Sequence, residues 1–144
     1  AISGNLTRRG QRKIQMTFQI KRVYESAKPS DGIRVLVDRL WPRGVKKATA
    51  HLDYWMKDVA PSPRLRLWFG HRRERFAEFG KRYKKELNGN AELAELRKLG
   101  RGALITLLYG ARDPQVNHAL VLQSVLRKVG SAKRKRKAAS ARVS

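Results

Sequence analysis

Three short apolar runs in the chain predict β-strands. In the first run, Phe18, Ile20 and Arg22 alternate with other residues, as in a strand that has one buried face. The second run, which contains Val35, Leu36 and Val37, is apolar at successive positions, as in a strand that is buried on both faces. The predicted strands cover residues 18–24, 33–38 and 103–108.

Apolar residues at intervals of three or four predict helices in the rest of the chain. The clearest stripe is Phe76, Phe79, Tyr83 and Leu87. Another helix is expected to begin at Pro63, with Ser62 as its cap. The last helix is expected to begin at Pro114, with Asp113 as its acidic cap. The buried stripe of this last helix is Leu122, Val125, Leu126 and Val129. Further helices are predicted for residues 51–59, 73–87 and 91–99, the last of these ending at Gly100, and the final helix extends to about residue 129.

This order of elements predicts a single small α/β domain over residues 16–129, with a short, mostly parallel sheet flanked by helices. Residues 1–15 are read as a basic N-terminal extension, and Met16 is a candidate natural start. Residues 130–144 contain no aromatic residue and are expected to be a disordered basic tail.

Composition gives the domain a strong positive charge. The chain has 34 Lys and Arg against 11 Asp and Glu, a net charge of +23, and the basic excess persists when both ends are left out. Such an excess favours polyanionic partners or anionic membranes, and we expect a phosphate-containing small molecule or a nucleic acid and no membrane. The absence of cysteine excludes disulfides, thiolate metal sites and thiol catalysis. No apolar run approaches the roughly 20 residues of a membrane span, so a soluble cytoplasmic protein is expected.

Two predicted strands run directly into loops that carry arginine. Residues 38–44 follow one strand, and residues 109–113 follow another. If both strands are parallel, these loops meet where open α/β sheets bind ligands, and we expect them to line one pocket. The candidate ligand-binding residues are Arg39, Trp41, Arg43, Arg112 and Asn117. The structural alternative is an internal Asp38–Arg39 ion pair with Trp41 as a core anchor.

The candidate groups for proton transfer are His118, His71, Asp38 and Asp113. The two carboxylates are expected to orient the arginines or to activate a nucleophile. The alternative for His118 is a hydrogen-bonded packing residue, and His71 is equally compatible with a helix cap. His51, His71 and His118 lack the spacing of metal ligands, so no metal site is predicted. No cofactor is predicted either, because the chain has no glycine-rich phosphate loop or dinucleotide fingerprint.

The run from Val35 to Gly44, Val-Leu-Val-Asp-Arg-Leu-Trp-Pro-Arg-Gly, resembles the signature of the YeaO-like bacterial proteins, a family classed as domain of unknown function 488. The resemblance spans about residues 17–127 and implies a small cytoplasmic α/β domain, leaving activity, substrate and cofactor open. It continues through separated motifs in the same order: residues 52–55, 60–62, 67–71, 79–83, 106–109, 112–113 and 117–118.

Three functions compete at this stage. The first is an α/β domain in which the strand-end arginines bind a phosphate or another anion. Whether such a domain also acts as an enzyme on a nucleotide or nucleic acid is left open. The second is a noncatalytic nucleic-acid binder that uses its basic helix face and tails. The residues of that alternative are Arg73, Lys81, Arg82, Lys84 and Lys85 on the helix and Lys133, Arg134, Lys135, Arg136 and Lys137 in the tail. The third is a domain that binds a small metabolite or a protein.

Overall fold

Four strands form one sheet in the order β1-β4-β2-β3 in the computed structural model, which describes residues 17–128. Every strand pair in this part of the chain is parallel; Phe18 of β1 is opposite Ile105 of β4, and Val35 of β2 is opposite Leu107 of β4. The small α/β domain with a parallel sheet is therefore confirmed. The strands are β1 (Thr17–Arg22), β2 (Ile33–Leu36), β3 (Tyr54–Trp55) and β4 (Leu104–Tyr109).

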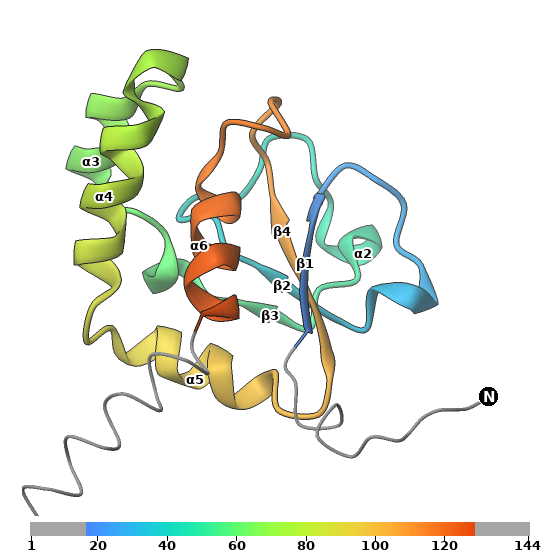
Figure 1. Cartoon of the computed structure of the whole chain (residues 1–144). Helices are drawn as coiled ribbons and strands as arrows, with labels where there is room; N and C mark the ends of the chain where they lie inside the picture. The colour runs from blue at the N-terminus through green and yellow to red at the C-terminus, as the bar shows by residue number, and fades with distance from the viewer. Residues whose placement is uncertain (1–16, 129–144) are drawn as a thin grey trace, which may run out of the picture.

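Helices cover the sheet unequally. Figure 1 shows α4 and α6 on one side of the strands and the short α2 on the other. The helices are α2 (Lys47–Ala50), α3 (Pro63–Phe69), α4 (Phe76–Leu87), α5 (Ala91–Leu99) and α6 (His118–Arg127). Single 3-10 turns are η2 (Pro29–Asp31), η3 (Lys57–Val59) and η4 (Arg73–Arg75).

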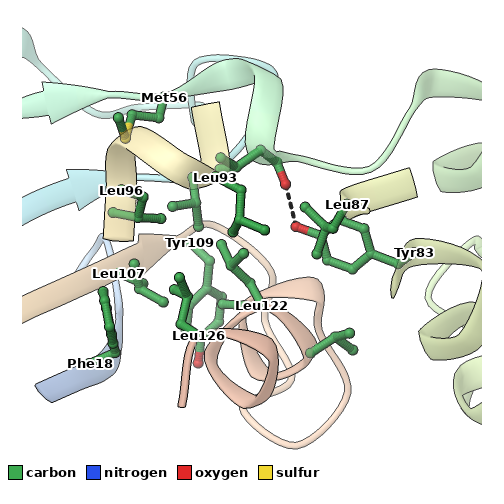
Figure 2. Close-up of a cluster of buried hydrophobic side chains, with 14 of the residues drawn as sticks. Phe18, Met56, Tyr83, Leu87, Leu93, Leu96, Leu107, Tyr109, Leu122 and Leu126 are labelled. Atoms are coloured by element: carbon green, nitrogen blue, oxygen red, sulfur yellow. Dashed lines mark hydrogen bonds between the residues drawn. The ribbon is translucent and has the colours of Figure 1, made fainter. Parts of the chain in front are cut away.

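The main core lies between the sheet and the helices α3 to α6. Alternation along β1 and β4 directs Phe18, Ile105 and Leu107 toward the helices, where they are fully buried. Figure 2 shows Phe18 and Leu107 in the same cluster as leucines of α5 and α6. The Tyr83 hydroxyl donates a hydrogen bond to the carbonyl of Val59, drawn as a dashed line in Figure 2, so this buried polar group has a partner.

Several predicted helices form as the sequence indicates. Ser62 caps α3, because its Oγ accepts a hydrogen bond from the amide of Leu65 at 3.2 Å, and Pro63 is the first helical residue. In α4 the predicted stripe is buried, apart from a partly exposed Phe76. Helix α5 ends before Gly100, where an added Cβ would lie 2.6 Å from the ring of Phe18, so only glycine fits there.

The predicted helix over residues 51–59 is wrong. This segment forms the edge strand β3 and the turn η3 instead. The amide of Asp53 donates to the carbonyl of Arg34 at 2.8 Å, and the amide of Met56 donates to the carbonyl of Leu36 at 2.9 Å. Pairing with β2 therefore decides the conformation of a short segment whose own pattern favoured a helix.

The predicted start of the last helix is also wrong. Helix α6 begins at His118, and its cap is Asn117, whose Oδ1 accepts from the amide of Leu120 at 3.0 Å. Asp113 instead closes a turn, because its Oδ1 accepts from the amide of Gln115 at 2.8 Å. The buried stripe of α6 includes Leu122 and Leu126 as predicted.

The predictions for residues 1–15, for Val129 and for the tail 130–144 lie outside the described residues. Within residues 17–128, no helix has the length and apolar character needed to cross a membrane.

Candidate functional site

A cavity of about 450 Å³ opens where β2 and β4 end. The loop after β2 contributes residues 38–43, the loop after β4 contributes Gly110 and Ala111, and the start of α6 contributes Asn117 and His118. The prediction that the two strand-end loops line one pocket is confirmed. Helices α3 and α4 form the opposite wall with Arg66, Phe69 and Phe79.

Asp38 joins the two strand ends at the base of the cavity. Its Oδ2 accepts a hydrogen bond from the amide of Gly110 at 2.9 Å, and its Oδ1 lies 3.3 Å from Nε2 of His118. An added Cβ at Gly110 would lie 2.9 Å from Oδ2, so this close approach of loop and carboxylate requires glycine. Among the described residues, the buried Oδ1 has no hydrogen-bond partner with acceptable geometry, so one oxygen of this carboxylate is unsatisfied.

His118 is the first residue of α6 and lies beside the same carboxylate. Its Nε2 is 2.9 Å from the carbonyl of Val37, and donation to that oxygen requires the proton on Nε2. Burial lowers the pKa of His118, while the neighbouring Asp38 and the Val37 carbonyl oppose that shift. Burial raises the pKa of Asp38, against the effects of His118 and the Gly110 amide. The two pKa values therefore move toward each other, which favours a neutral imidazole at the cavity base.

Arg39 is held by the backbone rather than by Asp38. Its Nε and Nη2 donate to the carbonyls of Pro61 and Ala60, each at 3.1 Å, and its Nη1 lies 3.6 Å from the exposed Asp58 carboxylate. The structural alternative of an Asp38–Arg39 ion pair is therefore wrong. With 27% of its side chain exposed, Arg39 contributes a fixed positive charge to the cavity wall.

Two other guanidinium groups at the cavity have no such partners. Arg43 lies on the loop after β2, where its backbone carbonyl accepts from the Tyr24 hydroxyl at 2.7 Å. Arg66 lies on α3. Both residues are exposed, and neither side chain forms an ion pair or hydrogen bond within residues 17–128. Sequence analysis missed Arg66. A charged residue next to Leu65 on a short predicted helix gives no indication of a ligand site.

Arg112 and Asp113 are not brought into the cavity. Arg112 is exposed and does not line it. Asp113 lies outside it as well, in an ion pair with Arg73 at 2.9 Å.

Asn117 and Trp41 line the cavity but also hold the fold. The amide nitrogen of Asn117 donates to the carbonyl of Asp113 at 2.8 Å, while its oxygen caps α6, so both polar atoms are engaged. The indole of Trp41 donates to the carbonyl of Val45 at 2.7 Å and meets the ring of Trp55 edge-on. We therefore assign these two residues structural roles at the rim.

His71 lines the cavity from the turn after α3. Its φ of 59° lies in the left-handed region and follows a left-handed Gly70, which is uncommon for a residue with a side chain. Its ring lies 5.9 Å from that of Phe69. His71 and His118, two of the candidate groups for proton transfer, thus line one cavity, from opposite walls. No group of three or more His, Cys, Asp or Glu side chains with metal-binding geometry occurs in the described part of the chain.

The basic face of α4 lies away from this cavity. Lys81, Lys84 and Lys85 line a separate groove, whereas Arg82 pairs with Glu78 at 3.0 Å and stacks over Trp68. Arg73 is engaged by Asp113. The tail residues Lys133, Arg134, Lys135, Arg136 and Lys137 lie outside the described residues.

Comparison with known proteins gives consistent matches over this domain. A protein of Mycobacterium tuberculosis strain H37Rv, "Uncharacterized protein Rv3073c", is 48% identical over 108 residues, which cover 75% of this chain and 92% of that protein. "Uncharacterized protein YeaO" of Escherichia coli K12 is 45% identical over 113 residues, 78% of this chain and 98% of that protein.

No solved structure matches the chain significantly. Residues 17–143 match the family DUF488-N3i, described as the "Inactive DUF488-N3 subclade". This match covers all described elements, and the YeaO relative agrees with the resemblance in the sequence motifs. The chain belongs to this YeaO-like DUF488-N3i family.

Proposed function

We propose that the cavity at the strand ends binds a small phosphate-containing anion. The observation that carries the proposal is that Arg43 and Arg66, which have no ion-pair partner among the described residues, line the same cavity as the backbone-held Arg39. Guanidinium groups stay charged and donate in pairs, which matches phosphate oxygens. Of the described residues that line the cavity, Asp38 is the one acidic residue, so the positive charges exceed the negative charges there.

The rest of the wall suits the uncharged part of such a ligand. Phe69, Phe79, Pro42 and Pro61 supply apolar surface around the cationic groups. A cavity that combines apolar walls with a few convergent polar groups is the usual form of a small-molecule site, and about 450 Å³ lies within the usual size range.

We assign this site a binding role without turnover. The Nε2 of His118 is engaged by the Val37 carbonyl, so the imidazole holds the strand end together instead of presenting that nitrogen to a ligand. The family description "Inactive" agrees with recognition rather than chemistry. The left-handed His71 is a second contact candidate, because unusual backbone geometry of this kind concentrates at ligand sites.

Isothermal titration with inorganic phosphate and with a nucleoside monophosphate tests the proposal. The variant Arg43→Gln/Arg66→Gln should bind at least about tenfold more weakly, because a hydrogen bond to a charged group contributes about 1.5–3 kcal/mol and about 1.4 kcal/mol corresponds to a factor of ten. The matched control is Arg64→Gln/Arg101→Gln, which removes two exposed charges that do not line the cavity. Equal affinity of the two double variants would overturn the proposal.

A further inference from the structure

A second concave surface lies at the other end of the helical layer. This groove of about 730 Å³ runs between the second half of α4, the start of α5 and the end of α6. Within residues 17–128, its charged lining residues are Lys81, Lys84, Lys85, Arg97 and Lys128, and no carboxylate lines it. The groove is separate from the cavity at the strand ends, since the two share no lining residue.

The lysines gather in the groove because of the phase of α4. Tyr83 and Leu87 anchor one face of the helix in the core. Lys81 precedes Lys84 by three residues and Lys85 by four, so its Cβ lies about 5–6 Å from theirs, and all three line the groove. Burial of the apolar stripe thus fixes a row of ammonium groups along the groove.

Four lysines of the groove have no acidic partner in the described part of the chain. Lys81, Lys84, Lys85 and Lys128 form no ion pair within residues 17–128, whereas the nearby Arg82 and Lys98 pair with Glu78 and Glu95. A neighbouring depression of about 290 Å³ between α4 and α6 shares Lys81 and Lys84 with the groove. That depression adds no further charged residue, so the positive charge is concentrated at the groove.

We propose that this groove binds the phosphodiester backbone of a nucleic acid without reading its bases. Lysine ammonium groups act as point charges on phosphate, and no aromatic ring lines the 730 Å³ groove to stack on a base. A concave surface suits a strand, while a membrane surface would be met better by a convex face with exposed apolar residues. Lys128 leads directly into residues 129–144, which contain six basic residues and no acidic one.

The test measures binding of a labelled DNA duplex of about 20 base pairs to the full-length chain at several salt concentrations. The variant Lys84→Gln/Lys85→Gln is compared with Lys46→Gln/Lys47→Gln, which removes the same charge from an adjacent lysine pair at α2. Each lost phosphate contact lowers the slope of log affinity against log salt by about 0.9. The groove variant should therefore lose about 1.8 from the slope, and a scrambled duplex should bind with the same affinity.

The tail is present in both variants, so the difference between them reports on the groove. Equal slopes for the two variants overturn the proposal. A clear preference for one duplex sequence also overturns it, because backbone contacts carry no sequence information. If Lys84→Gln/Lys85→Gln instead loses binding to phosphatidylserine vesicles while its DNA slope is unchanged, the groove is a membrane site and the proposal fails. Thermal melting of both variants confirms that each is folded.

Discussion

Charged residues lie at two places on the sheet, and they form ion pairs within the protein at only one of them. On the face of the sheet away from α4 and α6, Asp31 lies between Arg34 and Lys21. Asp31 and Arg34 are only 3% and 5% exposed. At the strand ends, Arg43 and Arg66 are exposed on a cavity, and their side chains form no ion pair or hydrogen bond among the described residues. The first set is satisfied within the protein, and the second set has the capacity to bind something else.

Each member of the Asp31 cluster, which consists of Asp31, Arg34 and Lys21, forms further hydrogen bonds within the protein. Arg34 also donates to the carbonyls of Ala50 and His51, and Lys21 to the carbonyl of Ser26. Burial by itself would raise the pKa of Asp31, but the amide of Lys28 and the side chains of Lys21 and Arg34 lower it to about 2. An arginine near a strand is therefore informative about ligands only when its own hydrogen-bond partners are known.

Removal of the charge on Asp31 should have the largest effect on stability. Asp31→Asn leaves Arg34 and Lys21 without a counter-ion in a buried site, and loss of one partner from a buried ion pair costs about 3–5 kcal/mol. Urea unfolding followed by circular dichroism measures this loss. A change below about 1 kcal/mol would show that the cluster is not a closed structural unit.

The same variant should change the acid stability of the protein. The pKa of Asp31 is lower in the folded state than its ordinary value of 3.8, so its contribution to stability is present above pH 3.8 and is lost as the pH falls toward 2. Asp31→Asn should remove that part of the pH dependence. Identical acid unfolding curves for the two proteins, once aligned at neutral pH, would contradict the assignment.

His118, at the base of the cavity, should affect the pH dependence of stability in a higher pH range than Asp31 does. Because burial lowers the pKa of His118, the unfolded chain takes up a proton near pH 6.5 before the folded protein does. Stability should therefore fall as the pH is lowered from 7 toward 5, and His118→Gln should flatten this decline while keeping a donor for the Val37 carbonyl. Melting temperatures at half-unit pH steps test this expectation, and a steeper decline in the variant would contradict it.

Local patterns account for the elements that the sequence predicted correctly. The stripe in α4 and the Ser62-Pro63 start of α3 lie within one element each, so neighbouring residues suffice to identify them. The strand β3 depends on pairing with β2, which lies about 20 residues earlier, and a two-residue strand has no pattern of its own. At α6, Asp113 and Asn117 are both good caps, and tertiary packing selects the second.

The distinction between local patterns and contacts of distant segments also explains which features of the candidate site the sequence predicted. The loops after two parallel strands meet because of topology, which the sequence predicted through its strands. The partners of Arg39 are carbonyls 21 and 22 residues away, and no local signal indicates them. Arg112 does not line the cavity, and α6 begins at His118 rather than at the predicted Pro114.

A glycine inside α4 offers a test, with a smaller expected effect, of how α4 packs against α6. Gly80 has ordinary helical geometry, and an added Cβ would lie 3.8 Å from Val121 of α6, at normal contact distance. Gly80→Ala should therefore stabilise the protein by about 0.5–1 kcal/mol through helix propensity. Destabilisation in urea would show that α4 and α6 pack too closely for a methyl group.

The smallest stability effect is expected at the cavity cations. Arg43→Gln/Arg66→Gln removes charges that have no partner in the described structure, so the free energy of unfolding should change by less than about 0.5 kcal/mol. This result beside the large loss in Asp31→Asn would separate a binding site from a structural cluster. A loss of more than about 2 kcal/mol would place the two arginines among the structural residues.

The most direct test of the anion site is an NMR titration of the protein with inorganic phosphate. The account predicts saturable shifts of the backbone amides of Gly110, Ala111 and Arg43 and of the His118 imidazole, with one dissociation constant that Arg43→Gln/Arg66→Gln weakens at least about tenfold. Saturable shifts confined to residues outside the cavity, or no saturable shift at these four positions, would contradict the account.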